Sequence, residues 1–216
     1  MRCSGVSDGS GTSSPQVPIA AGGAHRGRVV GIDRSFDLAI QRVATKWDNE
    51  LSREFLRLAG NVVKAYKALL VRRTDELVDL VHRENGKPAA DGFIEVLLAV
   101  EHLDWVARKA ARVLRSRRAA STLVLANQAA SVEYLPLGVV GVIGPWNYPV
   151  FTPSGAIASA LAAGNAVVFK PSELTPAVGR FLADAFAEVV PEQPVLQVVT
   201  GDGSTGDALC RAGVDK

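Results

Sequence analysis

The sequence predicts an α/β fold: a partial doubly wound parallel sheet, with an N-terminal helical segment and a β-hairpin arm. The run Val139–Ile143 is short, rich in Val and Ile and bounded by turn residues, which indicates a strand buried on both faces. Similar runs alternate with helical patterns up to residue 216. Upstream, apolar residues recur in steps of three and four, which is typical of an α-helix with one buried face.

Composition and charge exclude several classes of protein. Of the 216 residues, 48% are hydrophobic, which is enough for a sizeable core. A net charge of +2 requires neither nucleic acid nor a membrane surface as a partner. Two cysteines make no disulfide framework, and no signal core is visible, so we expect a reducing, cytoplasmic location. Residues 134–169 lack charge, but four prolines interrupt them, which favours a buried sheet over a membrane span.

The N-terminal part of the chain divides into a tail and a helical region. Residues 1–28 are rich in Ser, Gly and Pro, so we expect a disordered tail in which Cys3 is an untethered thiol. Residues 29–120 are expected to be the N-terminal helical part of the α/β domain. Within this part, Thr74 is the predicted N-cap of a helix that ends before Gly86. The next predicted helix, residues 91–114, is apolar on more than one face and should be sandwiched.

Residues 121–137 are expected to form the β-hairpin arm. Its predicted strands are residues 121–126 and 130–135, with Asn127 and Gln128 between them. A two-stranded ribbon is marginally stable alone, so the arm should pack on something else.

Residues 138–216 are expected to form an incomplete α/β core. After the first strand, Thr152 should cap a helix that ends at Gly164. A strand at 166–169, a helix at 176–189, a strand at 195–199 and a helix opening at Ser204 complete the alternation. Right-handed crossovers then give a parallel sheet, with ligands at the carboxyl ends of its strands.

Two motifs follow strands of this core, and their residues, order and separation carry a resemblance. The first is Gly144-Pro145-Trp146-Asn147-Tyr148-Pro149, and the second is Phe169-Lys170-Pro171-Ser172-Glu173. From about residue 50 onward, the chain resembles the NAD(P)-dependent aldehyde dehydrogenase superfamily. The resemblance implies a Rossmann-like NAD-binding domain, an aldehyde substrate oxidised to a carboxylic acid, and an arm that pairs with a neighbouring subunit.

The first motif implies a catalytic residue. Asn147 resembles the asparagine whose amide N–H stabilises the oxyanion formed when a thiolate attacks the aldehyde. Ile143, Gly144, Pro145 and Trp146 are expected to line the wall beside the cofactor. The alternative for Trp146 is an ordinary core tryptophan.

The second motif implies residues that bind the cofactor. Lys170, Ser172 and Glu173 resemble the contacts to the adenosine ribose, where a carboxylate accepts hydrogen bonds from both hydroxyls. Glu173 would repel a 2′-phosphate, so NAD is expected, with NADP as the alternative. The competing interpretation is an exposed Lys/Glu pair that caps the next helix.

Residues 201–206 spell GxGxxG between a strand and a helix, which is a dinucleotide fingerprint. One interpretation places pyrophosphate on the helix N-terminus; the other, from the resemblance, lets Gly203 and Gly206 line the adenine pocket. We favour the second because Asp202 puts negative charge where phosphate would approach.

The family's nucleophilic cysteine and general-base glutamate have no counterpart in this sequence, and Cys210 lies in a predicted helix. We therefore expect the catalytic domain to be absent and the chain to be inactive alone, with weak NAD binding. The alternatives are half of a split enzyme, completed by a second chain, and a non-catalytic binding or homo-oligomerisation module. No residue cluster has metal-ligand spacing, so no metal is expected.

Overall fold

The computed structural model describes residues 53–120, 122–125 and 127–216, so the predicted tail lies outside the described residues. The N-terminal elements are α2 (Arg53–Arg72), α3 (Thr74–Asn85), α4 (Ala89–Val113), β1 (Arg117–Ala119), the 3₁₀ turn η1 (Leu123–Leu125) and β2 (Ala130–Val132). The remaining elements are β3 (Val139–Ile143), α5 (Phe151–Ala162), β4 (Ala166–Lys170), α6 (Pro176–Val189), β5 (Leu196–Val198) and α7 (Gly203–Arg211).

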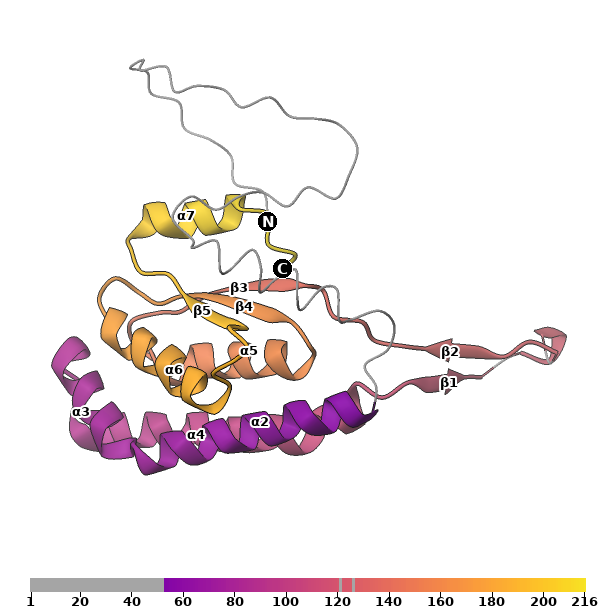
Figure 1. The fold of residues 1–216 in the computed structure, drawn as a ribbon, viewed down its shortest axis with the longest axis horizontal. Coiled ribbons are helices and arrows are strands. Elements are labelled where there is room, and N and C mark those ends of the chain that lie inside the picture. The colour runs from indigo at the N-terminus through magenta and orange to yellow at the C-terminus, as the bar shows by residue number, and fades with distance from the viewer. Residues whose placement is uncertain (1–52, 121, 126) are drawn as a thin grey trace, which may run out of the picture.

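The elements form layers around a parallel sheet of order β3-β4-β5 (Figure 1). Helices α5 and α6 cover one face of this sheet, and α7 lies on the other. Helices α2, α3 and α4 form a further layer beneath α5 and α6. Helices on both faces of a parallel sheet confirm the predicted doubly wound α/β fold.

Strand β4 is the centre of the sheet and is buried along its whole length. It pairs with β3 from Val139↔Ala166 to Ile143↔Lys170, and with β5 on its other side. The prediction that β3 is buried on both faces is wrong at its end, where Ile143 is 53% exposed. Ile143 closes the strand at the carboxyl edge of the sheet, where the covering helices leave room.

The C-terminal residues lie along the free edge of β3. The Asp215 N–H donates to the Val139 carbonyl over 2.9 Å, and the Gly141 N–H donates to the Lys216 carbonyl over 2.9 Å. The chain therefore moves outward from β3 to β5 and then returns through α7 to the opposite side of β3. Such a reversal of strand order is where open α/β sheets bind ligands.

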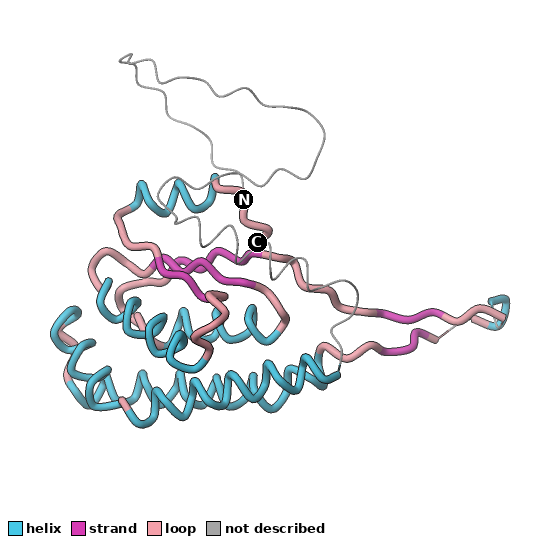
Figure 2. The backbone as a smooth tube through the Cα atoms, viewed as in Figure 1, coloured by secondary structure: helices cyan, strands magenta, loops and turns pink. Residues whose placement is uncertain are grey.

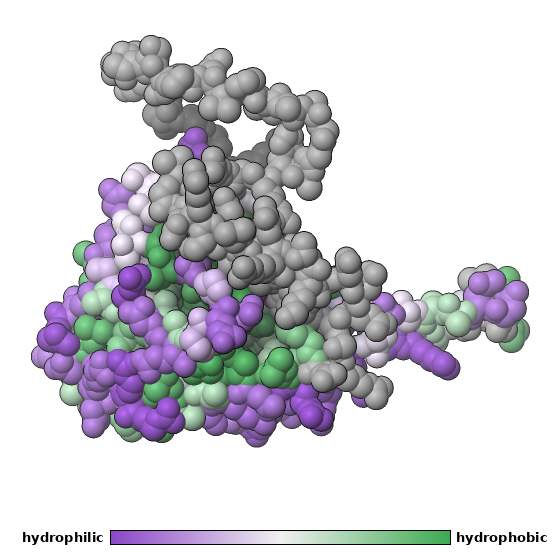
Figure 3. Space-filling model, in the orientation of Figure 1, coloured by the Kyte–Doolittle hydropathy of each residue, from purple (hydrophilic) through white to green (hydrophobic). Residues whose placement is uncertain are grey.

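The buried stripe of α2 finds its partners in α4 and α6. Its buried apolar residues are Leu56, Ala59, Val63, Tyr66, Leu69 and Leu70. The Tyr66 hydroxyl donates to the Leu182 carbonyl of α6 over 3.1 Å. Figure 3 shows hydrophilic residues along the outer border of this helical layer and hydrophobic residues between that border and the sheet.

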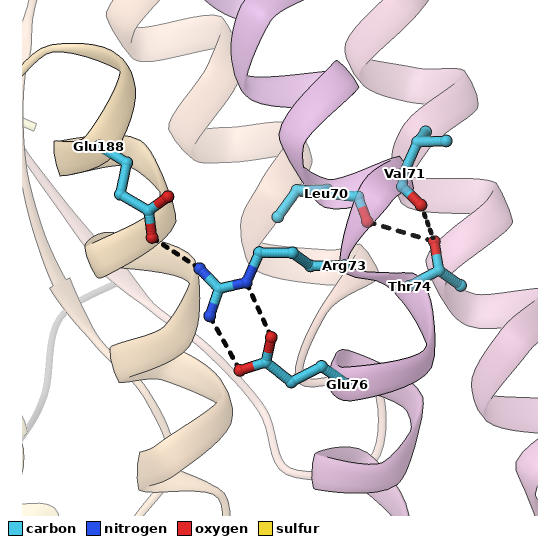
Figure 4. Close-up of polar contacts among 6 residues, drawn as sticks. All are labelled: Leu70, Val71, Arg73, Thr74, Glu76 and Glu188. Carbon is cyan, nitrogen blue, oxygen red and sulfur yellow. Dashed lines mark hydrogen bonds and ion pairs between the residues drawn. The ribbon is translucent and has the colours of Figure 1, made fainter.

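The predicted N-cap at Thr74 is wrong. The Thr74 hydroxyl donates backward, to the carbonyls of Leu70 and Val71 at 3.2 and 2.9 Å, and Arg73 occupies the cap position (Figure 4). Only Arg73 separates α2 from α3, so Thr74 satisfies the end of the first helix instead of the start of the second. The predicted end is confirmed, because Gly86 adopts a left-handed φ of 72°.

Arg73 ties the helical layer to the core. Its guanidinium binds both carboxylate oxygens of Glu76 at 2.8 Å and reaches Glu188 of α6 at 2.7 Å (Figure 4). It also lies 4.3 Å from the centroid of the Phe181 ring. Glu76 and Glu188 hold the pKa of the guanidinium above its ordinary value, so Arg73 is a permanent cation between α3 and α6.

The predicted N-cap at Thr152 is also wrong, because α5 begins at Phe151 and has no side-chain cap of its own. The first amides of this helix donate instead to Glu95 of α4, 55 residues upstream in sequence.

The prediction that residues 91–114 are sandwiched is wrong for one face of α4. Five large apolar residues of that face are exposed: Phe93, Ile94, Leu97, Leu98 and Trp105. The neighbours of α4, which are α2, α3 and α5, contact its other face. None of the described helices combines the length and apolar character that crossing a membrane requires.

The arm is a hairpin, but its first strand lies earlier than predicted. β1 pairs with β2 in antiparallel register from Arg117↔Val132 to Ala119↔Ala130. The predicted strand at 121–126 instead contains η1, where Leu123 and Val124 are 95% and 90% exposed. Figure 2 shows the ribbon projecting from the body of the molecule. The pairing therefore stops after three residues on each strand, and the tip forms a turn.

The packing of α6 on the strand-end loop generates a stability prediction. Gly179→Ala should destabilise the fold by about 1–3 kcal/mol, as overpacking does. A Cβ at this position would lie 2.4 Å from the Cβ and Cγ of Pro171, whose ring cannot move aside. The measurement is urea denaturation.

Gly92→Ala is the matched control for Gly179→Ala, because its Cβ would meet Val78 Cγ1 at an ordinary 3.4 Å. This variant should be neutral or gain up to about 1 kcal/mol from helix propensity. If the two substitutions changed the free energy of unfolding equally, close packing of α6 would not be the cause of the destabilisation.

Candidate functional site

The two predicted motifs meet at the carboxyl edge of the sheet. Ile143 and Lys170 are register partners at the ends of β3 and β4. The Gly144 N–H then donates to the Lys170 carbonyl over 2.9 Å, which extends the pairing into the loops. A side chain on Gly144 would not fit, because its Cβ would lie 2.9 Å from Phe169 Cε2. The loop carrying Asn147 is therefore anchored directly beside the Lys170 loop.

The Gly-rich motif at residues 201–206, which opens α7, lies beside the other two motifs. A Cβ on Gly206 would lie 3.6 Å from Lys170 Cδ and 3.9 Å from Ile143 Cδ1. The structure therefore brings together Ile143, Lys170 and Gly206 from three separate segments. A Cβ on Gly203 would meet no described atom within 4 Å, so crowding does not explain a glycine there, and its cofactor role stays a prediction.

Lys170 and Glu173 form a polar pair with very different exposure. The Lys170 side chain is 4% exposed, and its ammonium donates to the Pro171 carbonyl at 3.1 Å. Glu173 is 53% exposed, and its carboxylate lies 3.5 Å from Lys170 Nζ. Its own backbone N–H, followed by Lys170, holds the pKa of the Glu173 carboxyl below its usual value. The pair thus presents an ionised acceptor to solvent above a buried cation.

The alternative that this pair caps α6 is wrong. The first amides of α6, at Ala177 and Val178, donate to the two carboxylate oxygens of Glu84 at 2.9 Å each. Lys170 is also buried, whereas the capping interpretation required an exposed residue.

Ser172 is buried between these residues, and its hydroxyl accepts a hydrogen bond from the Leu174 N–H at 3.2 Å. This contact shapes the turn after β4. A direct contact from Ser172 to a cofactor stays a prediction.

Asp202 occupies the N-terminus of α7. Its Oδ1 accepts from the Ser204 N–H at 2.9 Å and from the Ser204 hydroxyl at 2.6 Å. The hydroxyl is the main cause that lowers the pKa of the Asp202 carboxyl, so the group is an anion. A helix N-terminus filled by a carboxylate is a poor site for phosphate, which supports the adenine interpretation of the Gly-rich turn over the pyrophosphate one.

The Asn147 loop combines exposed side chains with a held backbone. Trp146 is 53% exposed, so the core-tryptophan alternative is wrong. The Asn147 side chain is exposed, and none of the described residues hydrogen-bonds to its amide. The carbonyl of Trp146 accepts from Asn85 at 2.8 Å, and that of Asn147 accepts from Lys87 at 2.7 Å.

Sequence reasoning missed the residues behind this loop. Lys87 forms an ion pair with Glu95, a carboxylate that is only 1% exposed. The signal was available, because Glu95 is the single charged residue in the apolar run 92–100 of a predicted helix. A carboxylate in such a run needs a buried partner.

Neither thiol chemistry nor a metal site is evident in the part of the chain that the structure describes. Cys210 is an exposed, free cysteine within α7, as the sequence predicted for its position. No group of three or more His, Cys, Asp or Glu side chains among the described residues could hold a metal ion.

Comparison with known proteins identifies the family. The sequence model of the aldehyde dehydrogenase family matches residues 35–215. The chain belongs to the aldehyde dehydrogenase family. It is 37% identical over 155 residues to a probable coniferyl aldehyde dehydrogenase of Pseudomonas aeruginosa, covering 71% of this chain and 32% of that protein.

Two further relatives agree with this assignment. An N-succinylglutamate 5-semialdehyde dehydrogenase of Sphingopyxis alaskensis is 34% identical over 194 residues, which cover 88% of this chain and 38% of that protein. The crystal structure of an NAD-dependent benzaldehyde dehydrogenase from Corynebacterium glutamicum superimposes with a TM-score of 0.69 and 28% identity, covering 81% of this chain and 37% of that one. The chain thus spans about a third of the length of these relatives.

These findings confirm the resemblance stated from the two motifs and the Rossmann-like fold. They also support the predicted nicotinamide cofactor. The relatives' names differ in the aldehyde, so they give no common substrate.

The cap of α7 generates a prediction about pH. Ser204→Ala should raise the pKa of the Asp202 carboxyl toward its ordinary value, because the hydroxyl is the largest cause of the shift. The backbone N–H of residue 204 would still donate, so the return should be incomplete. The measurement is a carbon-13 NMR titration, with the Glu76 carboxyl, whose pKa is lowered by Arg73, as the internal control. An unchanged Asp202 titration would contradict this assignment.

The sign of the accompanying stability change follows from the lowered pKa. The contribution of Asp202 to stability is present above the ordinary aspartate pKa and is lost as the pH falls through the folded-state value. Ser204→Ala should reduce that contribution.

Proposed function

We propose that residues 138–216 form the adenosine-binding part of the NAD site of an aldehyde dehydrogenase, and that Asn147 is its oxyanion donor. One observation carries the proposal. The ionised, exposed carboxylate of Glu173 and the free amide of Asn147 follow adjacent strands, at the edge where the strand order reverses. An α/β sheet binds its ligand at such an edge.

Glu173 and Lys170 fit the ribose of the adenosine. The Glu173 carboxylate can accept hydrogen bonds from both ribose hydroxyls, and the nearby Lys170 ammonium favours its charged state. We assign the adenine to the Gly-rich start of α7 because Gly206 lies close to Lys170 and Ile143. Bound NAD would supply the hydride acceptor for the oxidation.

Asn147 fits the addition step that precedes oxidation of the aldehyde. When a thiolate adds to the aldehyde carbon, the carbonyl oxygen becomes an anion, and the Asn147 amide can donate to it. Such a donor is typically worth ~2.7–4 kcal/mol of transition-state stabilisation. The thiolate and the general-base carboxylate would come from residues other than those described, because Cys210 lies on the exposed side of α7.

The β1–β2 arm supports a second, compatible role in self-association. Its tip carries Leu123 and Val124, which are 95% and 90% exposed, and such apolar side chains favour burial against another protein surface. A second copy of the chain is the partner that we propose, in line with the family resemblance of the arm.

The ribose assignment predicts which ligands bind. Adenosine and NAD should bind these 216 residues with similar affinity, because the proposed contacts reach only the adenosine end. Glu173→Gln should weaken adenosine binding about tenfold, the cost of a hydrogen bond to a charged group. Adenosine 2′-phosphate should bind the parent more weakly than adenosine, because Glu173 repels the phosphate. The measurement is chemical-shift titration by NMR.

The control for Glu173→Gln is Glu192→Gln, an exposed carboxylate that precedes β5 at the opposite edge of the sheet. It should leave adenosine affinity unchanged. Tight NAD binding that survives Glu173→Gln would contradict the ribose assignment.

The chemistry predicts no turnover by these residues alone. A purified polypeptide of these 216 residues should not reduce NAD in the presence of an aldehyde, because no described thiol faces Asn147. The measurement is NADH absorbance over time, beside a relative of the family as the positive control. Sustained turnover that disappears on Asn147→Ala would refute this prediction.

A further inference from the structure

Lys87 lies at the centre of a set of contacts behind the Asn147 loop. Its ammonium lies 2.5 Å from Glu95 Oε2 and donates to the Asn147 carbonyl at 2.7 Å. It also lies 4.3 Å from the centroid of the Tyr148 ring. The side chains of Lys87 and Glu95 are 14% and 0% exposed, and this low exposure strengthens their ion pair, whereas the contact with Asn147 lies at the surface.

Glu95 extends the same network to the other side of the loop. Its second oxygen, Oε1, accepts hydrogen bonds from the amides of Val150 and Phe151 at 2.7 and 3.1 Å. These amides are the first groups of α5, which otherwise lacks a side-chain cap. The Lys87–Glu95 pair therefore joins the carbonyl of Asn147 to the start of the following helix.

The backbone of this loop is held, whereas the functional side chain is left open. Asn85 adds a hydrogen bond to the Trp146 carbonyl at 2.8 Å, from the residue before the turn at Gly86. The side-chain amide of Asn147 has no hydrogen-bond partner among the described residues and is exposed. This arrangement suits a donor that must point at an acceptor supplied from outside.

We propose that Lys87 and Glu95 are a positioning pair that fixes the Asn147 loop for oxyanion stabilisation. The inference rests on the proposed function of Asn147. Buried ion pairs add little net stability, and neutral groups of similar shape often replace them without loss. Here Glu95 Oε1 accepts from the Val150 amide at one end of the loop, and the Lys87 ammonium donates to the Asn147 carbonyl within it. The pair therefore selects one loop conformation.

The test is a double variant that removes both charges and keeps both shapes, Lys87→Met with Glu95→Gln in the 216-residue chain. It leaves no unpaired buried charge, so the melting temperature should stay near that of the parent. The amides of Val150 and Phe151 should exchange with deuterium about tenfold faster, because the loop opens more often. The NMR signal of the Asn147 side-chain amide should also move or broaden.

The matched control is Lys67→Met with Asp104→Asn. This pair also joins a lysine to a carboxylate of α4, at 2.7 Å, and has no contact with the Asn147 loop. It should leave the loop amides and the Asn147 signal unchanged. Asn85→Ala serves as the second test variant if the double variant does not fold, and should speed exchange in the loop alone.

Two results would overturn the inference. In the first, the double variant keeps the parent's loop exchange and Asn147 signal. In the second, the buried β4 amides of Val167 and Phe169 speed up as much as the loop, which would make the pair merely structural. Adenosine binding separates this test from the proposed function, because the variant leaves Lys170 and Glu173 intact. If the unsubstituted chain binds no adenosine, the proposed function is refuted. The hydrogen-exchange data would still decide whether Lys87 and Glu95 position the loop.

Discussion

The burial of β4 on both faces is the constraint on which the rest of the fold depends. Its five residues are all buried, so strands must flank it and helices must cover both faces. The fit is close: the backbone of Gly144 lies against the Phe169 ring, and that of Gly179 lies against Pro171. Because Lys170 is the last residue of this strand, the packing that buries Phe169 also fixes the position of the Lys170 side chain. The candidate site is thus a consequence of how the core is covered.

Polar contacts couple the outer helical layer to this core as much as apolar packing does. Neither α5 nor α6 begins with a side-chain cap of its own. Glu95 and Glu84 supply the missing acceptors from α4 and α3, and Arg73 binds Glu188 of α6. Glu95 and Glu84 lie at the positive ends of the helix dipoles of α5 and α6, which favours their negative charge. The helical layer therefore does more than cover α5 and α6, because it completes their first turns.

The sequence predicted those elements whose signals are local. Helix α6 follows the prediction because Pro176 suits a first turn and its apolar residues keep helical spacing, and β4 follows it because its run is continuously apolar. The predictions failed where the partner is distant. The caps at Thr74 and Thr152 look correct by local rules, yet Arg73 occupies the cap position of α3 without a side-chain cap, and Glu95 of α4 caps α5. Likewise, the two site motifs follow strands and were found, whereas Lys87 behind them has no local pattern that marks it.

Adjacent strands explain how the proposed ribose contact and the proposed oxyanion donor come to share one site. Ile143 and Lys170 are register partners, so the two loops leave the sheet about 4.8 Å apart, the spacing of paired strands. Sheet geometry fixes where each loop begins but not where Asn147 points, beyond the end of β3. That orientation depends on contacts outside the sheet, and in the described chain these come from Asn85, Lys87 and Glu95. The sheet therefore sets the distance between the proposed ribose contact and the proposed oxyanion donor, and the contacts from Asn85, Lys87 and Glu95 orient the Asn147 loop.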